Sequence, residues 1–356
     1  PALPEKGRGA LLHVAPILCS ASALWCLALA CERAGPAPRE TALDESAEEP
    51  DFDALSALGY TDSADVQENA ALPPEKDGLV LRDPARSWPG YDLVVNVADA
   101  TAVLTDSEGR EVHRWSPAVP SIGHCARLLP DGDLLLIASR SPETVGQAGY
   151  LARLGWNGEP RWSLDIGAHH DVEQLGDGRI VVLTMRTSHE FAPWTEGGIY
   201  DNFVTVLSAQ GEKLDERSLY RVLSSNRALF RLRKGRAEGR TTPADVLHVN
   251  SVEWVERSDL DRGHPAYARA SVLISARHQN VVALFDWTDG ELLWAWGPGE
   301  TGLQHDARML ANGNVMMFDN GARARAWSRI VEVDPRENAI VWEYRDRVDV
   351  LMFFSS

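Results

Sequence analysis

From about residue 80 onward, short runs of Val, Ile and Leu alternate with turns rich in Gly, Asp and Asn, and no apolar stretch recurs with the period of a helix. Several runs are joined by Asp-Gly or Asn-Gly. These pairs favour tight hairpin turns, because glycine accepts positive φ without steric cost. The pattern predicts an all-β domain built from antiparallel hairpins.

The hairpins form an internal repeat. Three copies begin with a histidine and reach a turn glycine eight residues later; they run from His124 to Gly132, from His170 to Gly178 and from His305 to Gly313. A fourth copy begins at His248 and carries a polar insert, 256–269, before its second strand resumes at Ser271. The repeat therefore has at least four copies.

A second hairpin that ends in tryptophan follows most copies, and a related one precedes the first. These hairpins span 102–115, 150–162, 281–294 and 330–342. Two hairpins give four strands per unit, and steps of 46 to 78 residues between histidines are typical of β-propeller blades. The segment 186–245 is too long for one hairpin, so we expect an added loop or helix there.

We assign residues 76–356 to this propeller. We expect six blades in the full protein and a last blade that is incomplete here, because the chain stops in mid-pattern at Phe353-Phe354-Ser355-Ser356.

Equivalent positions of a closed ring of blades converge on its axis. The first strand of each blade lies beside the central channel, so the repeat predicts that His124, His170, His248 and His305 meet there. A histidine at any one position can equally be structural, hydrogen-bonded to the backbone. Four around one cavity favour a site for a polar ligand, because unpaired buried polar groups are costly.

Composition narrows the choice of ligand. The 356 residues are 44% hydrophobic and 24% charged, which is ordinary for a globular protein with a sizeable core. A net charge of −17 argues against nucleic-acid binding, yet local Arg and His can still attract small anions. No Gly-x-x-x-x-Gly-Lys phosphate loop occurs, so a nucleotide ligand would lack its usual phosphate cradle.

The N-terminal region has the pattern of an export signal. Lys6 and Arg8 precede an apolar run from Ala10 to Ala30, so we assign residues 1–30 to a signal peptide. The sequence Leu-Ala-Leu-Ala-Cys ending at Cys31 is similar to a lipobox, which predicts lipidation of Cys31. We expect a periplasmic or cell-surface protein anchored to a membrane by lipid. A plain signal peptide and a single membrane span are the alternatives.

Residues 31–75 are acidic and rich in Pro, as in a solvated tether. With Cys19 and Cys26 removed and Cys31 lipidated, Cys125 would remain as an unpaired thiol in the mature domain.

Several motifs together resemble a known family. They are Asp-Val-Leu-His-Val-Asn-Ser at 245–251, Ile-Ser-Ala-Arg-His-Gln-Asn at 274–280, Gln-His-Asp-Ala-Arg at 304–308, Phe-Asp-Asn-Gly at 318–321, His-His-Asp at 169–171 and Val-Trp-Glu-Tyr at 341–344. Over residues 80–356 the chain resembles the bacterial arylsulfate sulfotransferases. The resemblance implies a propeller that moves a sulfuryl group from an aryl sulfate to a phenol through a sulfated histidine, without a cofactor or a metal.

Carried over motif by motif, the resemblance implies that His305 is the nucleophile. The His-x-Asn pair becomes His248 and Asn250, and the arginine of the Arg-His-Gln run becomes Arg277. The His-His-Asp run gives His170, which the eight-residue spacing also selects over its neighbour. The chain departs from the family in showing no extra N-terminal β-domain and no cysteine pair in the mature domain.

These residue types suit sulfuryl transfer. Neutral imidazole is a competent nucleophile near pH 7, and His305 would carry the group between two half-reactions. Arg277 is a fixed cation with planar donors for sulfate oxygens. Asn250 and His248 can donate to those oxygens as charge develops, and His170 can do the same or protonate the leaving phenolate. We also place His124 among the substrate-binding residues by its repeat position.

Three other functions stay open. One is a non-catalytic propeller lipoprotein that binds a ligand or a partner. Another is a four-histidine metal site with Asp171 or Asp306 behind it, which the charge of Arg277 would oppose. The third is a quinoprotein-like dehydrogenase, for which no motif is present. Strand alternation predicts that His278 turns away from Arg277 and packs between blades. The oligomeric state is left open.

Overall fold

The computed structural model describes residues 84–345, except for short segments at 86, 119–120, 141–148, 191–195, 234–240, 257–258, 261–263, 268–269, 322–324 and 326. The predictions about the signal peptide, the tether and Cys31 lie outside these residues. No helix of the described part is long and apolar enough to cross a bilayer.

The described strands form five antiparallel sheets, each a run of neighbours in chain order. The first sheet holds β1 (Tyr91–Val95), β2 (Ala102–Asp106) and β3 (Glu111–Trp115). The second holds β4 (Ile122–Leu128), β5 (Leu134–Ser139), β6 (Tyr150–Leu154) and β7 (Pro160–Asp165). The third holds β8 (Ala168–Gln174), β9 (Ile180–Ser188), β10 (Ile199–Leu207) and β11 (Lys213–Ser218).

The fourth sheet holds β12 (Val249–Val255), β13 (Ser271–Ala276), β14 (Val281–Asp286) and β15 (Leu292–Trp296). The fifth holds β16 (His305–Met309), β17 (Val315–Asp319), β18 (Arg329–Asp334) and β19 (Ala339–Tyr344). Helix α2 (Leu219–Ser225) follows β11, and two short 3₁₀ turns, η4 (Pro265–Tyr267) and η5 (Arg277–Gln279), complete the described elements.

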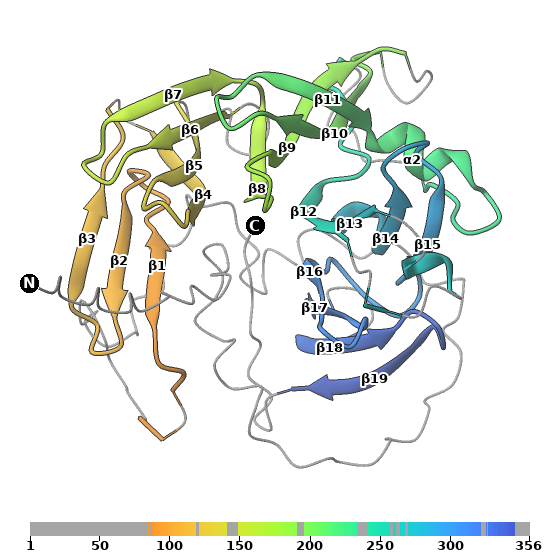
Figure 1. The fold of residues 1–356 in the computed structure, drawn as a ribbon. Helices are drawn as coiled ribbons and strands as arrows, with labels where there is room; N and C mark the ends of the chain where they lie inside the picture. The colour runs from red at the N-terminus through yellow and green to blue at the C-terminus, as the bar shows by residue number, and fades with distance from the viewer. Residues whose placement is uncertain are drawn as a thin grey trace, which may run out of the picture.

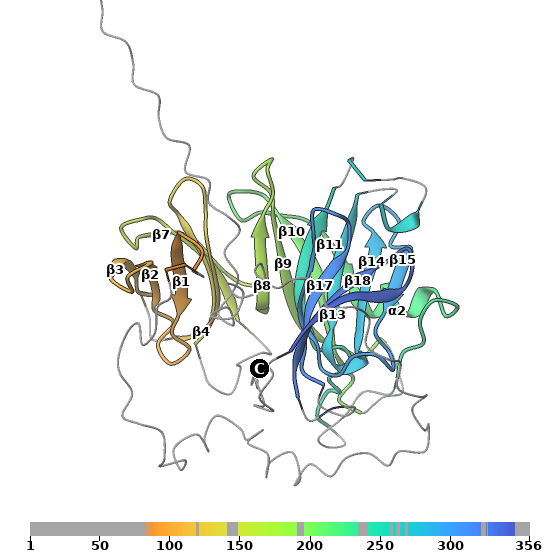
Figure 2. The same ribbon diagram turned by 90° about the horizontal axis from the view of Figure 1, so that it is seen from below.

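The sheets stand as blades around a common axis, with β4, β8, β12 and β16 innermost (Figure 1). Figure 2 shows the same blades from below, with β8 and β9 between the sheet of β1–β3 and the sheets of β12–β19. The predicted all-β propeller of four-stranded blades is therefore confirmed, although the sheet of β1–β3 has three described strands. The polar insert and both hairpin types fall where the repeat predicts them.

The core lies between neighbouring blades. The middle strands β5, β13, β14 and β17 are buried at every position, because both faces of each blade pack against a neighbour. One cluster joins β9 and β10 to β12, β13 and β14, and α2 adds Leu219 and Leu223 to it. The outer strand β7 instead alternates between exposed and partly buried residues, as expected for an edge that faces solvent.

Each inner strand is interrupted at the repeated histidine or directly after it. The pairing register shifts between Gly123 and Cys125 in β4, between Ala168 and Val172 in β8, between Val249 and Ser251 in β12, and between His305 and Arg308 in β16. A bulge of this kind bends a strand and re-aims its side chains. The equivalence of the four copies in sequence is thus matched by an equivalent irregularity in structure.

In the full-length chain Cys125 is buried and disulfide-bonded, and the other cysteines of the chain lie outside the described residues. The expected unpaired thiol concerns the mature domain, from which Cys19 and Cys26 are removed and in which Cys31 is lipidated, so the disulfide of the full-length chain does not test it.

Candidate active site

Histidines from four blades lie within electrostatic reach of one another. Burial lowers the pKa of His170 well below its usual value, and His169, His248, His124 and His305 lower it further, because protonated imidazoles would repel a charge on His170. The rings of His170 and His248 lie 5.1 Å apart, edge to face. The predicted convergence of the four repeated histidines is therefore present.

His305 begins β16 with its two ring nitrogens in different roles. Its Nδ1 lies 2.9 Å from the carbonyl oxygen of Leu303 and therefore donates to it, which leaves Nε2 as the nitrogen with a lone pair. That Nε2 is buried and makes no hydrogen bond within the described residues. Burial first, and then the charges of Arg277 and His248, lower the pKa of His305 to about 3. The ring is neutral at pH 7, as a nucleophile must be.

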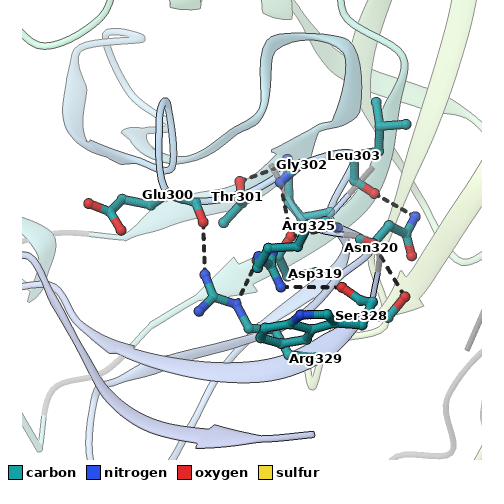
Figure 3. A network of polar contacts seen from close by, with 12 residues as sticks. Glu300, Thr301, Gly302, Leu303, Asp319, Asn320, Arg325, Ser328 and Arg329 are labelled. Atoms are coloured by element: carbon teal, nitrogen blue, oxygen red, sulfur yellow. Dashed lines mark hydrogen bonds and ion pairs between the residues drawn. The ribbon is translucent and has the colours of Figure 1, made fainter. Parts of the chain in front are cut away.

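The loop before His305 is held by a network of buried polar groups (Figure 3). Asp319 is fully buried, accepts from the backbone N–H of Gly302 at 2.9 Å and pairs with Arg325 and Arg329. Arg329 in turn donates to the carbonyl of Glu300 at 2.8 Å. This network fixes the loop from the side of β17 and β18.

The amide of Asn320 completes this support. Its Nδ2 donates to the carbonyl of Leu303 at 2.7 Å and lies 3.2 Å from Nδ1 of His305. The same carbonyl thus receives both Asn320 and His305 and fixes the ring's orientation. Sequence reasoning used Asn320 only as part of a motif and missed this role.

Arg277 lies beside His248 because η5 packs on the start of β12. Its backbone N–H donates to the carbonyl of His248 at 3.2 Å, and its Nη1 lies 3.0 Å from Nε2 of His278. The prediction that His278 packs between blades is wrong. This residue belongs to a 3₁₀ turn rather than a strand, so alternation does not apply, and its ring lies 4.6 Å from that of His248.

Asp245 contacts both His248 and His278, and sequence reasoning did not single it out. Its Oδ2 lies 2.6 Å from Nδ1 of His248, and its backbone carbonyl accepts from Nδ1 of His278 at 3.0 Å. Its position three residues before His248 in the Asp-Val-Leu-His run is the signal that could have indicated it.

Two site histidines have left-handed backbone conformations, with φ of 54° at His170 and 47° at His248. Such conformations cost residues other than glycine about 1–2 kcal/mol, and they gather at functional sites. His170 also contacts its neighbour, with 2.8 Å between its Nδ1 and that of His169. Both members of the His-His pair therefore belong to the cluster, whereas spacing selected only His170.

Asn250 and His124 lie at the edges of the cluster. The Nδ2 of Asn250 donates to the carbonyl of Gln304 at 2.9 Å, so one of its two amide hydrogens supports the residue before His305. His124 lies in the bulge of β4, and burial lowers its pKa. Its charge lowers the pKa of His169 and of His170, which places it on their side of the cluster.

An ion network lies farther along the inner strands. The buried Asp171 accepts from Arg127 at 2.9 Å, from Arg308 at 2.7 Å and from the backbone N–H of Val252 at 3.0 Å. It therefore joins β4, β8, β12 and β16 below the histidines. Beyond it, the turn ends of β8 and β12 border an open pocket, lined by residues such as Leu175, Arg179 and Trp254, that contains none of the histidines.

The described residues offer one grouping with metal-like spacing, in which ligand atoms of Asp245, His248 and His278 lie within 4.8 Å of one another. Nδ1 of His248 already bonds to Oδ2 of Asp245, Nδ1 of His278 bonds to the backbone carbonyl of Asp245, and the guanidinium of Arg277 contacts His278. A fixed cation at that distance opposes a metal ion. The two carboxylates considered for a metal site, Asp171 and Asp306, instead pair with arginine.

Comparison with known proteins identifies one protein family that the chain matches. The family model described as Arylsulfotransferase (ASST) matches residues 126–351, which include every site residue named above except His124. No curated protein matches the chain.

Solved structures resemble the chain only distantly. They include a Bacteroides caccae protein of unknown function (13% identity, 74% of this chain and 85% of that one, TM-score 0.44), BamB from Moraxella catarrhalis (12%, 72% and 62%, 0.35) and a quinohemoprotein alcohol dehydrogenase from Pseudomonas putida HK5 (11%, 72% and 52%, 0.41). Likenesses this weak carry no argument about what the site does.

Proposed function

Because the chain belongs to the arylsulfotransferase family, we propose that it transfers a sulfuryl group from an aryl sulfate to a phenol through a sulfated His305. The observation that carries the proposal is the hydrogen bonding and protonation of the His305 ring. Its Nδ1 is committed to Leu303, its Nε2 has a lone pair and no partner among the described residues, and its ring is kept neutral beside a fixed cation.

The first half-reaction follows from these positions. Nε2 of His305 attacks the sulfur of the donor, an N–S bond forms, the S–O bond breaks and the phenolate leaves. Arg277 supplies the charge that holds the sulfuryl oxygens, and Asn250 can donate with its second amide hydrogen. His124 and His170 belong to the same cluster and can contact the donor. The oxygen of the acceptor phenol then attacks the sulfur of the sulfated His305, the N–S bond breaks, the phenolic proton passes to a base of the site and the free enzyme is regenerated.

The test is transfer from 4-nitrophenyl sulfate to a phenol acceptor by the purified protein. Acceptor-dependent release of nitrophenol together with formation of the sulfated acceptor supports the proposal. No turnover with a range of aryl sulfates and phenols would instead favour a ligand-binding propeller.

Replacing Arg277 with Met should lower kcat by about 10²–10³-fold, the usual cost of losing one group that stabilises developing charge. Because the charge of Arg277 lowers the pKa of His305, its removal should also raise that pKa. The acid limb of the pH–rate profile, where His305 becomes protonated and inactive, should move to higher pH. Steady-state rates across pH check both effects, with Arg336→Met, a half-exposed arginine in the turn after β18, as the control.

We further propose that the protein is exported and held to a membrane through lipidated Cys31. The basic and apolar pattern of residues 6–30 and the lipobox-like sequence support this. Replacing Cys31 with Ser should move the expressed full-length protein from the membrane fraction to the soluble fraction. An unchanged distribution would remove the lipid anchor and leave a plain signal peptide or a membrane span.

A further inference from the structure

Asp245 makes two contacts to one residue of the site. Its Oδ2 lies 2.6 Å from Nδ1 of His248, and its Oδ1 accepts from the backbone N–H of His248 at 3.1 Å. The second contact holds the left-handed conformation of His248, and the first fixes its ring. Oδ2 of Asp245 also lies 3.6 Å from Nδ1 of His278, a longer contact than the one to His248.

The pairing defines what each nitrogen of His248 can do. A carboxylate only accepts hydrogen bonds, so Nδ1 of His248 carries a proton and donates it to Asp245. Nε2 of His248 is buried, has no partner among the described residues, and belongs to a ring 5.1 Å from that of His170. It is thus available to a substrate atom.

The other histidines are poor proton carriers at neutral pH. Burial lowers the pKa of His169 and of His305 to about 3 and that of His278 to about 4, and burial also lowers the pKa of His170. Asp245 behaves differently from these histidines, because its surroundings favour its charged form. Burial acts to raise its pKa, but the charge and hydrogen bond of His248 outweigh this and leave the pKa below its usual value. The carboxylate is therefore ionised beside His248.

We propose that Asp245 is a positioning residue that fixes the Nδ1–H form of His248 and balances its charge, so that Nε2 of His248 exchanges a proton with the phenolic oxygens. This inference rests on the proposed sulfuryl transfer. The groups that face His248 are Asp245 from its own segment, His169 and His170 from β8, Arg277 and His278 from η5 and His305 from β16.

The proton balance closes over the two half-reactions. When the S–O bond of the donor breaks, Nε2–H of His248 gives its proton to the phenolate oxygen, and a neutral phenol leaves. In the second half-reaction the acceptor's O–H gives its proton to Nε2 of His248 while its oxygen bonds to sulfur and the N–S bond to His305 breaks. Asp245 stays ionised throughout, and no other acid or base is required.

Asp245→Asn tests the role, because it keeps an oxygen for the backbone N–H of His248 but presents an amide N–H to Nδ1. The amide donor forces Nδ1 to accept and moves the ring proton to Nε2 without a balancing charge. We expect kcat/KM for phenyl sulfate, a poor leaving group, to fall by about 10²-fold. For 4-nitrophenyl sulfate, whose phenolate leaves without a proton, the loss should stay below about fivefold. An equal loss with both donors would overturn the proposal.

Asp201→Asn is the matched control. Asp201 is a buried carboxylate that accepts from the hydroxyl of Ser218 at the start of α2, away from the histidines. Any damage from this substitution should affect both donors alike.

A second measurement does not depend on turnover. In the ¹⁵N spectrum of the histidine-labelled full chain, the signals of His248, identified by their loss in His248→Asn, should report a protonated Nδ1 in the wild type and an altered Nδ1 in Asp245→Asn. Unchanged signals would refute the pairing. An inactive wild type would refute the proposed function and with it the catalytic part of this inference, so the two failures give different patterns.

Discussion

Replacing His305 with Asn should lower kcat/KM for an aryl sulfate by at least about 10⁴-fold, because loss of a covalent nucleophile removes the step that every later event depends on. Asparagine is close to histidine in size and can still donate to the carbonyl of Leu303, which receives Nδ1 in the wild type. The fold should therefore survive, and thermal unfolding of both proteins checks this.

The matched control is His113→Asn. His113 lies on the outer strand β3, stacked on Trp156 with ring centroids 3.9 Å apart, and makes no contact with the histidine cluster. Its replacement should leave the rate of transfer unchanged. Wild-type turnover in a folded His305→Asn protein would remove His305 from the mechanism.

Asp171→Ala should have the largest effect on stability. The substitution leaves the guanidinium groups of Arg127 and Arg308 near the axis without their shared carboxylate, and the backbone N–H of Val252 without its acceptor. Removing one partner of a buried ion pair costs about 3–5 kcal/mol, and Arg308 keeps Asp306, so we expect a loss of about 3 kcal/mol. Urea denaturation at pH 7 measures it.

The effect should depend on pH with a definite sign. Burial acts to raise the pKa of Asp171, but Arg308 and Arg127 outweigh it and hold this pKa below its usual value. A lowered pKa contributes stability that is present above the unfolded value of about 4 and is lost as pH falls through the folded value. The difference between wild type and variant should thus shrink below about pH 4.

Asp165→Ala provides the comparison, because Asp165 pairs with Arg140 and is 71% exposed. An exposed pair of this kind contributes at most about 1 kcal/mol. Equal losses for Asp171→Ala and Asp165→Ala would show that the network at the axis does not hold the blades together.

The ring of blades could be predicted from the sequence because the repeat consists of features that depend on local chemistry. Turn glycines such as Gly132, Gly178 and Gly313 all have positive φ, as the hairpin assignment requires. Their constant distance from a histidine aligned three inner strands, and the copy that begins at His248 supplied the fourth. Because equivalent positions of a closed ring converge on its axis, this alignment predicted that the four histidines lie near one another.

Other features depend on contacts that no local pattern encodes. β10 and β11 fall inside the segment 186–245, where a loop or helix was expected; α2 is there, but two strands of the third blade precede it. His278 was misplaced because alternation was applied across a 3₁₀ turn. Asp245 was missed because its role arises from a backbone fold that brings it back onto His248.

Mass spectrometry of the protein mixed with an aryl sulfate in the absence of an acceptor tests the central claim most directly. The account predicts that one sulfuryl group becomes attached to the peptide that contains His305, that it is discharged when a phenol is added, and that it is absent from His305→Asn. A sulfuryl group on another residue, or turnover with no attached group during rapid quenching, would contradict it.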